Sequence, residues 1–408
     1  MSKFLIVGAG QAGLQLAFGL VQDGHEVTVV SNRAADDIRA GRVMSSQCMF
    51  DAALEHEREL GVNFWEPECP DIEGISLAVP APGGGKMIDW AARLERPAQS
   101  VDQRLKIPGW IEKLEEQGGK IVLHDASVPD LEAYARDNDL VIVAAGKGEV
   151  AQLFERDAAR SPYAAPQRAL ALTYVTGMTP RPEYPAVAFN LIPTVGEYFV
   201  FPALTTGGAC EIMVFEGIPG GPMDCWSDVT TPEEHLAKSK WILETLLPWE
   251  AERCRNLELT DDNGILVGRF PPTVRHPVGE LPSGALVLGL ADTVVLNDPI
   301  TGQGSNNASK SAAAYLASIL GHGDAPFDRA FMEQTFEGYW DYDAQYVTTW
   351  TNALLGPPPP HVLELLVAGN DHPAVARRFV NGFNDPRDYF DWFMEPDKAS
   401  RYLAEVAA

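Results

Sequence analysis

Hydrophobic residues at the start of the chain form one continuous run and then change to a helical period. The run Phe4–Val7 is typical of a buried strand, and apolar positions from Leu14 onward recur every three or four residues. Gly8, Gly10 and Gly13 lie between the two patterns. A Gly-x-Gly-x-x-Gly turn between a strand and a helix is typical of a dinucleotide site, because it lets a pyrophosphate approach the backbone at the helix N-terminus. The pattern therefore predicts a nucleotide-binding unit here.

The next apolar run, His25–Ser31, predicts a second parallel strand whose end should contact the adenosine ribose. That place usually carries a carboxylate, about 20 residues after the glycines. This chain has Ser31, Asn32 and Arg33 instead. An arginine here is compatible with the 2′-phosphate of NADP and equally with the adenylate of FAD, so the turn leaves the cofactor open.

Two later apolar runs predict further buried strands of the same sheet. Asp139–Lys147 ends in small residues, among them Ala145 and Gly146, and Ala285–Asp292 leads towards a second glycine-rich turn. That turn, Asp298–Gly304, opens another helical pattern. Two strand–turn–helix junctions far apart in the sequence indicate one long ligand that is contacted at both ends.

The character of the chain changes between residues 168 and 269, where short alternating apolar runs are separated by Pro and Gly. This pattern predicts an inserted antiparallel sheet. The predicted fold class is α/β, with a Rossmann-like nucleotide-binding domain, an inserted antiparallel β-sheet substrate domain and a C-terminal helical region. We place the discontinuous nucleotide-binding domain at residues 1–70, 96–167 and 270–325, the substrate domain at residues 71–95 and 168–269, and the helical region at residues 326–408.

Composition excludes several classes of partner. The 408 residues carry a formal net charge of −26, which argues against binding nucleic acid or an anionic membrane. No apolar run approaches the roughly 18 residues of a membrane span, and residues 1–20 lack a signal-peptide leader, so we expect a cytoplasmic protein. Five scattered cysteines without a Cys-x-x-Cys pair, and eight histidines without ligand spacing, predict no disulfide framework and no metal site.

Longer motifs carry a specific resemblance. Gly8–Gly13, Asp139–Gly146 and Gly289–Gly304 resemble the three FAD motifs of flavoprotein monooxygenases with the p-hydroxybenzoate-hydroxylase fold. Pro166–Arg168 and Trp350–Asn352 narrow the resemblance to the styrene and indole monooxygenases, and it extends over nearly the whole chain. It implies a two-component FAD-dependent epoxidase whose FAD arrives reduced, by diffusion, from an NADH-dependent flavin reductase.

In that family, as the resemblance implies, reduced FAD and O2 form a flavin C4a-hydroperoxide that epoxidises an electron-rich aromatic alkene. The cofactor carries this chemistry, so no catalytic triad or carboxylate pair is required. A homodimer is compatible with the sequence. Two alternatives stay open, namely a single-component NAD(P)H-dependent aromatic hydroxylase and a catalytically silent FAD- or NADP-binding protein.

The resemblance also assigns cofactor contacts. Asp292 is expected at the ribityl chain, Arg104 at the pyrophosphate, and the loop Pro299–Gly304 along the flavin ring. The full set of expected FAD-binding residues is Gly8, Gly10, Gln11, Ala12, Gly13, Ser31, Asn32, Arg33, Arg104, Ala145, Gly146, Asp292, Pro299, Gly302, Gln303, Gly304, Ser305 and Asn306.

A few pocket positions separate styrene from indole enzymes in the family. Styrene enzymes show Asn-x-Val where this chain has Ser45-Ser46-Gln47, and Ser where it has Ala98, whereas both places match the indole type. Ile75 matches neither type. We therefore expect indole as the substrate, with epoxidation at the 2,3-bond leading to indigo, and styrene as the alternative. Ser45, Ser46 and Gln47 are the expected catalytic positions, although a polar loop that caps a helix would look the same. The expected substrate-binding residues are Ile75, Ala98, Val187, Phe189, Leu191, Phe199 and Pro202.

Overall fold

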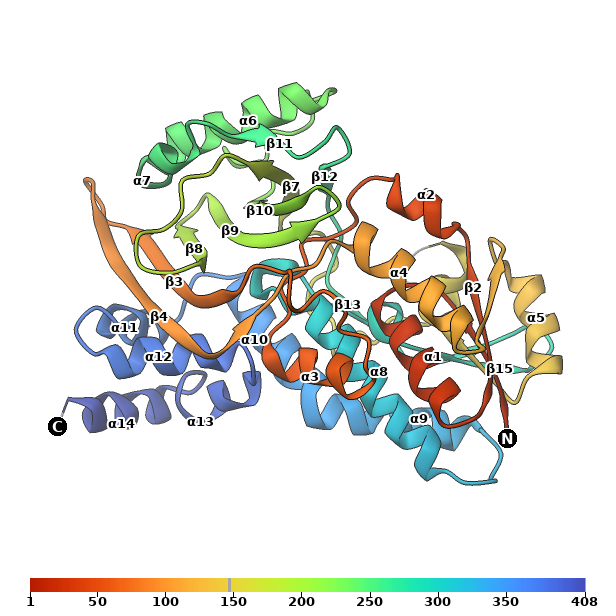
Figure 1. Cartoon of the computed structure of the whole chain (residues 1–408). Helices are drawn as coiled ribbons and strands as arrows, with labels where there is room; N and C mark the ends of the chain where they lie inside the picture. The colour runs from red at the N-terminus through yellow and green to blue at the C-terminus, as the bar shows by residue number, and fades with distance from the viewer. Residues whose placement is uncertain (146–147, 408) are drawn as a thin grey trace.

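The computed structural model describes residues 1–145 and 148–407. Two large sheets lie side by side, one wrapped by the N-terminal helices and the other between helix α6 and the C-terminal helices, and a third sheet among these residues has only two strands (Figure 1). The predicted α/β class with a C-terminal helical region is confirmed. Among the described residues, no helix combines the length and the apolar character needed to cross a membrane.

The first sheet has six strands within the described residues, and all but β14 run parallel. Strand β1 lies between β2 and β6, which explains its unbroken apolar run, because a central parallel strand is covered on both faces. In spatial order the strands are β14 (Val278–Glu280), β15 (Leu286–Gly289), β6 (Leu140–Val143), β1 (Lys3–Val7), β2 (Glu26–Ser31) and β5 (Lys120–Leu123).

Helix α1 (Gln11–Gln22) packs closely on α8 (Gly304–Gly321), although they come from opposite parts of the chain (Figure 1). A Cβ on Gly19 would lie 2.2 Å from Cδ2 of Leu316, so the Leu316 side chain packs directly over the backbone of α1 at this glycine. The Nε2 of Gln15 donates to the carbonyl of Ser309 at 2.9 Å. The two glycine-rich turns are thus the starting points of two adjoining helices. The sheet also carries α4 (Gln103–Glu116) and α5 (Val128–Asp137).

The second sheet has eight strands within the described residues and differs from the expectation in two details. Strand β3 pairs with β8 in parallel, so the sheet is mixed rather than purely antiparallel. Strand β4 continues to Ala98, past the boundary expected at residue 95. In spatial order the strands are β11 (Glu258–Leu259), β7 (Ala169–Thr176), β10 (Gly208–Gly217), β9 (Gly196–Thr205), β8 (Ala186–Ile192), β3 (Ile72–Pro80) and β4 (Lys86–Ala98), and β12 (Ile265–Gly268) also pairs with β7.

The two faces of this second sheet bury different clusters, since successive side chains of a strand point to opposite faces. Phe189 and Phe199 belong to the cluster that contains Ile300 and the C-terminal helices. Tyr198, one residue before Phe199, belongs to the cluster under α6 (Pro232–Leu246). The face that contains Phe199 is therefore the one that meets the second glycine-rich turn.

The C-terminal helices pack against β4 through aromatic side chains. Trp90 of β4 donates its indole N–H to the carbonyl of Leu366 at 2.8 Å, and the rings of Trp350 and Tyr389 lie 4.5 Å apart. One irregularity is the π-helical turn Trp340–Ala344. The helices are α9 (Arg329–Tyr339), α10 (Gln345–Leu354), α11 (Pro360–Ala368), α12 (Pro373–Gly382), α13 (Tyr389–Trp392) and α14 (Pro396–Val406), and the remaining short elements of the chain are α2 (Ala35–Arg39), α3 (Asp51–Glu59), α7 (Pro248–Ala251), β13 (Thr273–Val274) and β16 (Val295–Leu296).

Candidate active site

The turn after β1 has the backbone geometry of a phosphate-binding turn. Gly8 has a φ of +119°, and a Cβ there would lie 2.6 Å from the carbonyl oxygen of Ala144. A Cβ on Gly13 would lie 2.1 Å from the carbonyl oxygen of Gly8. At Gly10, the N-cap of α1, a Cβ would meet no described atom within 4 Å. The fold itself requires glycine at positions 8 and 13, whereas Gly10 faces open space at a helix N-terminus, where an anion is stabilised.

The side chain of Gln11 points into the protein rather than towards this space. Its Nε2 donates to Glu57 at 2.8 Å, and Lys106 forms an ion pair with the same carboxylate at 2.7 Å. Both charged side chains are buried. Gln11 and Ala12, the first two residues of α1, can therefore offer a ligand their backbone N–H groups.

The residues expected to contact the adenosine part of the cofactor are Ser31, Asn32 and Arg33, Ala145 and Gly146 are expected at the cofactor as well, and the structure describes all but the last. Ser31 is buried, and its hydroxyl donates to the carbonyl of Arg33 at 2.7 Å, so it stabilises its own turn. Asn32 and Arg33 are exposed, and the Arg33 guanidinium contacts Sδ of Met44. Ala145 is half-buried at the end of β6, and Gly146 lies outside the described residues.

The second glycine-rich turn combines a capped 3-10 turn with an open helix end. Asp298 accepts the backbone N–H of Ile300 at 3.2 Å and caps the turn Pro299–Thr301. Gly302 follows with a left-handed φ of 63°. A Cβ on Gly302 or Gly304 would meet no described atom within 4 Å, and Gly304 begins α8. This junction therefore also presents a helix N-terminus and open space to a ligand.

Two polar side chains near this turn form hydrogen bonds with backbone groups of other segments. Asn306 accepts the N–H of Phe50 and donates to the carbonyl of Cys48, both at 2.8 Å. Gln303 donates to the carbonyl of Phe383 at 3.0 Å, while its buried Oε1 has no partner among the described residues. Asn306 thus links the turn to the segment that follows the expected catalytic positions. Ser305, between them, is half-buried.

Asp292 is exposed just beyond β15, in the 3-10 turn Ala291–Thr293. Ala291 beside it has a φ of +52°, a left-handed conformation that costs a non-glycine residue about 1 kcal/mol. Strain of this kind gathers at ligand sites, and no sequence pattern announced it.

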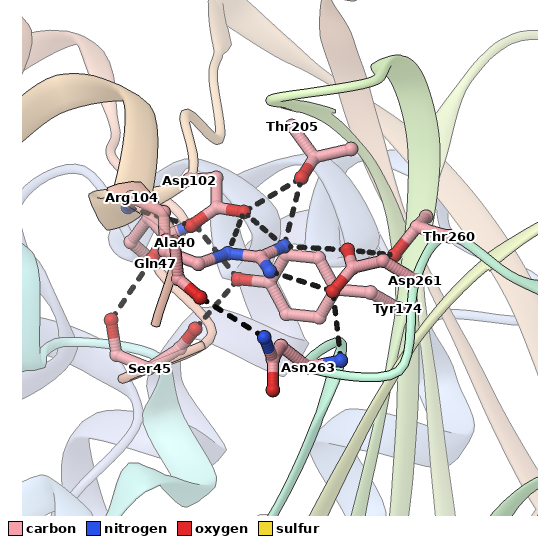
Figure 2. A network of polar contacts seen from close by, with 10 residues as sticks. All are labelled: Ala40, Ser45, Gln47, Asp102, Arg104, Tyr174, Thr205, Thr260, Asp261 and Asn263. Carbon is pink, nitrogen blue, oxygen red and sulfur yellow. Dashed lines mark hydrogen bonds and ion pairs between the residues drawn. The ribbon is translucent and has the colours of Figure 1, made fainter. Parts of the chain in front are cut away.

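Ser45 and Gln47 form a closed set of hydrogen bonds with Tyr174 of β7 (Figure 2). The Ser45 hydroxyl donates to Oε1 of Gln47 at 2.9 Å, and Gln47 Nε2 donates to the Tyr174 hydroxyl at 3.2 Å. That hydroxyl donates to the carbonyl of Ser45 at 2.7 Å. Burial raises the pKa of Tyr174 well above its ordinary value, so the phenol keeps the proton it donates. Ser46, between them, is half-buried.

Arg104, the residue expected at the pyrophosphate, lies beside this set (Figure 2). Its guanidinium bonds both oxygens of Asp261 at 2.9 and 3.1 Å, and its Nε bonds Asp102 at 2.9 Å. Thr205 accepts a further bond at 3.2 Å. The side chain is buried. Arg104 therefore joins α4 to the second sheet, and its described hydrogen bonds go to protein groups.

The apolar positions expected to bind substrate fall on one face of the second sheet, with one exception. The rings of Phe189 and Phe199 lie 4.5 Å apart on neighbouring strands. The other positions in the same cluster are Ile75, Ala98, Val187 and Leu191. Ile300 of the second turn also belongs to this cluster, so the cluster reaches the glycine-rich junction.

Pro202 is the exception and lies on the other face of the sheet. It lines a cavity of about 340 Å³ with Val200, Glu211 and Arg181. Val200 belongs to the cluster under α6, so this cavity opens on the opposite face of the sheet. Pro202 is therefore separated from the other expected substrate contacts by the sheet itself.

The described residues fit a dinucleotide with a polar ring system at one end. Open space at Gly10, Gly302 and Gly304 lies at two helix N-termini that are held side by side, and the unpartnered Oε1 of Gln303 belongs to the same junction. In the part of the chain that the structure describes, no group of three or more His, Cys, Asp or Glu residues could hold a metal ion.

Comparison with known proteins agrees with this geometry. Residues 146–253 match the family model described as styrene monooxygenase A putative substrate binding domain. The chain is 30% identical to styrene monooxygenase StyA of Pseudomonas fluorescens, covering 98% of this chain and 97% of that one. A second StyA, from a Pseudomonas species, gives the same identity and coverage. A flavin-dependent brominase shares the fold, with a TM-score of 0.60 at 14% identity over 99% of both chains.

The fold, the two turns and these relatives define a flavoprotein monooxygenase whose cofactor is FAD. More narrowly, the chain belongs to the styrene monooxygenase family. The resemblance carried by the sequence motifs is thereby confirmed at the level of the family.

Proposed function

We propose that this protein is the epoxidase component of a two-component monooxygenase and that it epoxidises indole at its 2,3-bond. It takes reduced FAD by diffusion from an NADH-dependent flavin reductase, in the cytoplasm where NADH is available. The observation that carries the proposal is the connection between two parts of the site. Ser45 and Gln47 are bonded to the sheet through Tyr174, and Asn306 bonds the same segment to the second turn.

When bound, reduced FAD would supply the electrons that activate O2 for oxygen transfer, and the protein's own residues would bind and orient the reactants and exclude water. The N-terminus of α8 stabilises negative charge on the flavin. The apolar face with Phe189 and Phe199 keeps water from the alkene. The segment Ser45–Gln47 supplies the polar contacts at the edge of this apolar surface.

The choice of indole rests on the residue types at Ser45, Gln47 and Ala98. Indole has an N–H group, which styrene lacks. An amide oxygen has two lone pairs, and the Ser45 hydroxyl occupies one on Oε1 of Gln47. The other can accept an indole N–H. Styrene is the second candidate, favoured by the relatives that are named styrene monooxygenases.

Supply of FAD by diffusion is supported by the adenosine end of the site. A carboxylate is absent from the turn after β2, the Ser31 hydroxyl bonds its own loop, and Asn32 is exposed. Fewer contacts to the ribose suit a cofactor that must arrive reduced and leave oxidised. An Asn32→Glu variant should then bind oxidised FAD more tightly in a fluorescence titration, and unchanged affinity would contradict this point.

The deciding experiment is a reductase-coupled assay with indole and styrene side by side, scoring indigo and styrene oxide. We expect kcat/KM to favour indole. The double variant Ser45→Asn, Gln47→Val should shift the ratio towards styrene by about ten-fold, because a lost hydrogen bond to the substrate costs about 1.4 kcal/mol. An unchanged ratio would remove these residues from specificity, and NADH oxidation without any reductase would indicate a single-component enzyme.

A further inference from the structure

Three acidic side chains meet where the second sheet contacts the second glycine-rich turn. Glu216 on β10 is directly opposite Glu197 on β9, and Asp298 is the cap of the turn. Glu216 has no exposed surface, and Glu197 and Asp298 are 7% and 3% exposed. Carboxylates directly opposite one another repel, and burial makes each negative charge more costly. The cluster therefore needs either counter-charges or protons.

One counter-charge comes from Arg168, which precedes β7. Its Nε and one terminal nitrogen donate to the two oxygens of Glu197 at 2.6 and 2.9 Å. Other donors of the same guanidinium reach the carbonyls of Gln167 and Leu355. Arg168 thus neutralises Glu197. Glu216 and Asp298 form no ion pair of their own among the described residues, and Arg168 acts on both only through its charge.

Glu216 and Asp298 lie close enough to share a hydrogen bond, which can form only if one of the two carboxyls is protonated; with both ionised, neither oxygen of Glu216 has a partner among the described residues. No donor among the described residues reaches either oxygen of Glu216, whereas Asp298 already accepts the N–H of Ile300. Burial, followed by the charges of Asp298 and Glu197, raises the pKa of Glu216 well above its ordinary value. Burial also raises the pKa of Asp298, to about 6. The proton therefore resides on Glu216, and the pair titrates as a unit.

We propose that Glu216 is a positioning residue of the flavin site, which donates its proton to Asp298 and so holds the carboxylate that caps the turn Pro299–Thr301. This inference rests on the proposed binding of the flavin ring along that turn. It adds to the cofactor site a residue of the substrate domain, more than 80 positions away in sequence from the turn it supports.

The pH dependence follows from the charges that face Glu216, which are Asp298, Glu197 and Arg168. A carboxyl whose pKa is raised by folding contributes stability that is fully present below about pH 4 and is lost as the pH rises through the folded value. Between these limits the pair keeps at least one proton. When this proton is lost at higher pH, Glu216 and Asp298 are both negatively charged and repel each other. The repulsion displaces the Asp298 carboxylate from the turn Pro299–Thr301 and weakens FAD binding.

The test is an FAD titration of the purified protein by flavin fluorescence between pH 6 and pH 9, with reduced FAD titrated anaerobically in parallel. In the wild type, the Kd should rise about ten-fold towards pH 9. In Glu216→Gln, whose amide donates to Asp298 without titrating, the Kd should stay constant across the range. In Glu216→Leu, which cannot donate, the Kd should be raised about ten-fold already at pH 7.

A matched control is Glu211→Gln. Glu211 is on the same strand but lines the cavity on the opposite face, and burial raises its pKa to about 7. This variant should change how the thermal midpoint of the FAD-free protein depends on pH, and leave the pH dependence of the FAD Kd as in the wild type. Glu216→Gln should change the pH dependence of the thermal midpoint and also that of the FAD Kd.

A Glu216→Gln variant with the wild-type pH dependence of the FAD Kd would overturn the proposal, and so would an equal effect of Glu211→Gln. If Glu216→Leu does not fold, the comparison of Glu216→Gln with Glu211→Gln still tests the proposal. Because no substrate is present, a failure of epoxidation leaves this result unaffected. Absence of FAD binding by the wild type would overturn both proposals.

Discussion

The two glycine-rich turns serve similar purposes but are built differently. In the first, Gly8 and Gly13 are required because a side chain would overlap backbone atoms at 2.6 and 2.1 Å. In the second, side chains of the turn and of the start of α8 bond distant segments: Asn306 bonds Phe50 and Cys48, and the Thr301 hydroxyl pairs with that of Thr351 at 2.7 Å. The first turn is fixed by steric exclusion against backbone atoms, those of Gly8 itself and those of Ala144 just beyond the neighbouring strand β6, and the second by hydrogen bonds to elements far away in the chain. The second should therefore be the more adjustable one.

The largest expected effect is at the first turn. Gly13→Ala should lower the free energy of unfolding by about 3 kcal/mol, because the new methyl group must displace the backbone of Gly8. Urea denaturation measures this change. Gly10→Ala is the matched control, since a methyl group there meets no described atom.

The control separates folding from ligand binding. Gly10→Ala should unfold at the wild-type urea concentration but bind FAD about ten-fold more weakly, because the methyl group occupies the approach of the pyrophosphate. Equal stability of Gly13→Ala and Gly10→Ala would contradict the idea that exclusion fixes this turn.

At the second turn, Asn306→Ala should cost about 2 kcal/mol, because it leaves the N–H of Phe50 and the carbonyl of Cys48 buried without partners. Thermal or urea unfolding gives the magnitude. The exposed Asn32 provides the comparison, and Asn32→Ala should change the free energy of unfolding by less than about 0.5 kcal/mol. A loss below that level in Asn306→Ala would show that the long-range bonds are dispensable.

The smallest effect concerns the hydroxyl pair that joins the second turn to α10. Thr301→Val and Thr351→Val should each cost about 1 kcal/mol, since each leaves one buried hydroxyl unpaired. The double variant should cost less than the sum, because both partners are then removed together. Additive losses in urea unfolding would mean that the two hydroxyls act independently.

The same contrast explains what sequence could and could not reveal. The first turn was predictable because its glycines follow a fixed local spacing, although one of its constraints, the approach of Gly8 to Ala144, comes from a distant segment. The FAD motifs identified the family. The hydrogen-bond partner of Ser45 and Gln47 could not be predicted, because Tyr174 comes from a strand whose register no local sequence pattern determines. Arg104 matched a motif, yet its direction depends on Asp261, more than 150 residues further on.

The separation of Pro202 from the other expected substrate residues could have been read from the sequence. Pro202 follows Phe199 by three positions on the same strand, and an odd separation places two side chains on opposite faces. Phe189 and Phe199 met on one face as expected because their strands pair directly. The pairing of Glu216 with Asp298 gave no signal in the sequence, because the two acids come together only when the sheet meets the turn.

The hydrogen bond from Gln15 to Ser309 closes a loop of 294 residues. During synthesis, α1 leaves the ribosome long before α8, the helix on which it packs. The apolar face of α1 therefore stays unpacked until about three quarters of the chain has been made. Pairings at such separation are slow to form and expose hydrophobic surface meanwhile. A nascent chain cut short before α8 therefore has a formed first turn with nothing to pack against, and it is a natural substrate for chaperones and proteases.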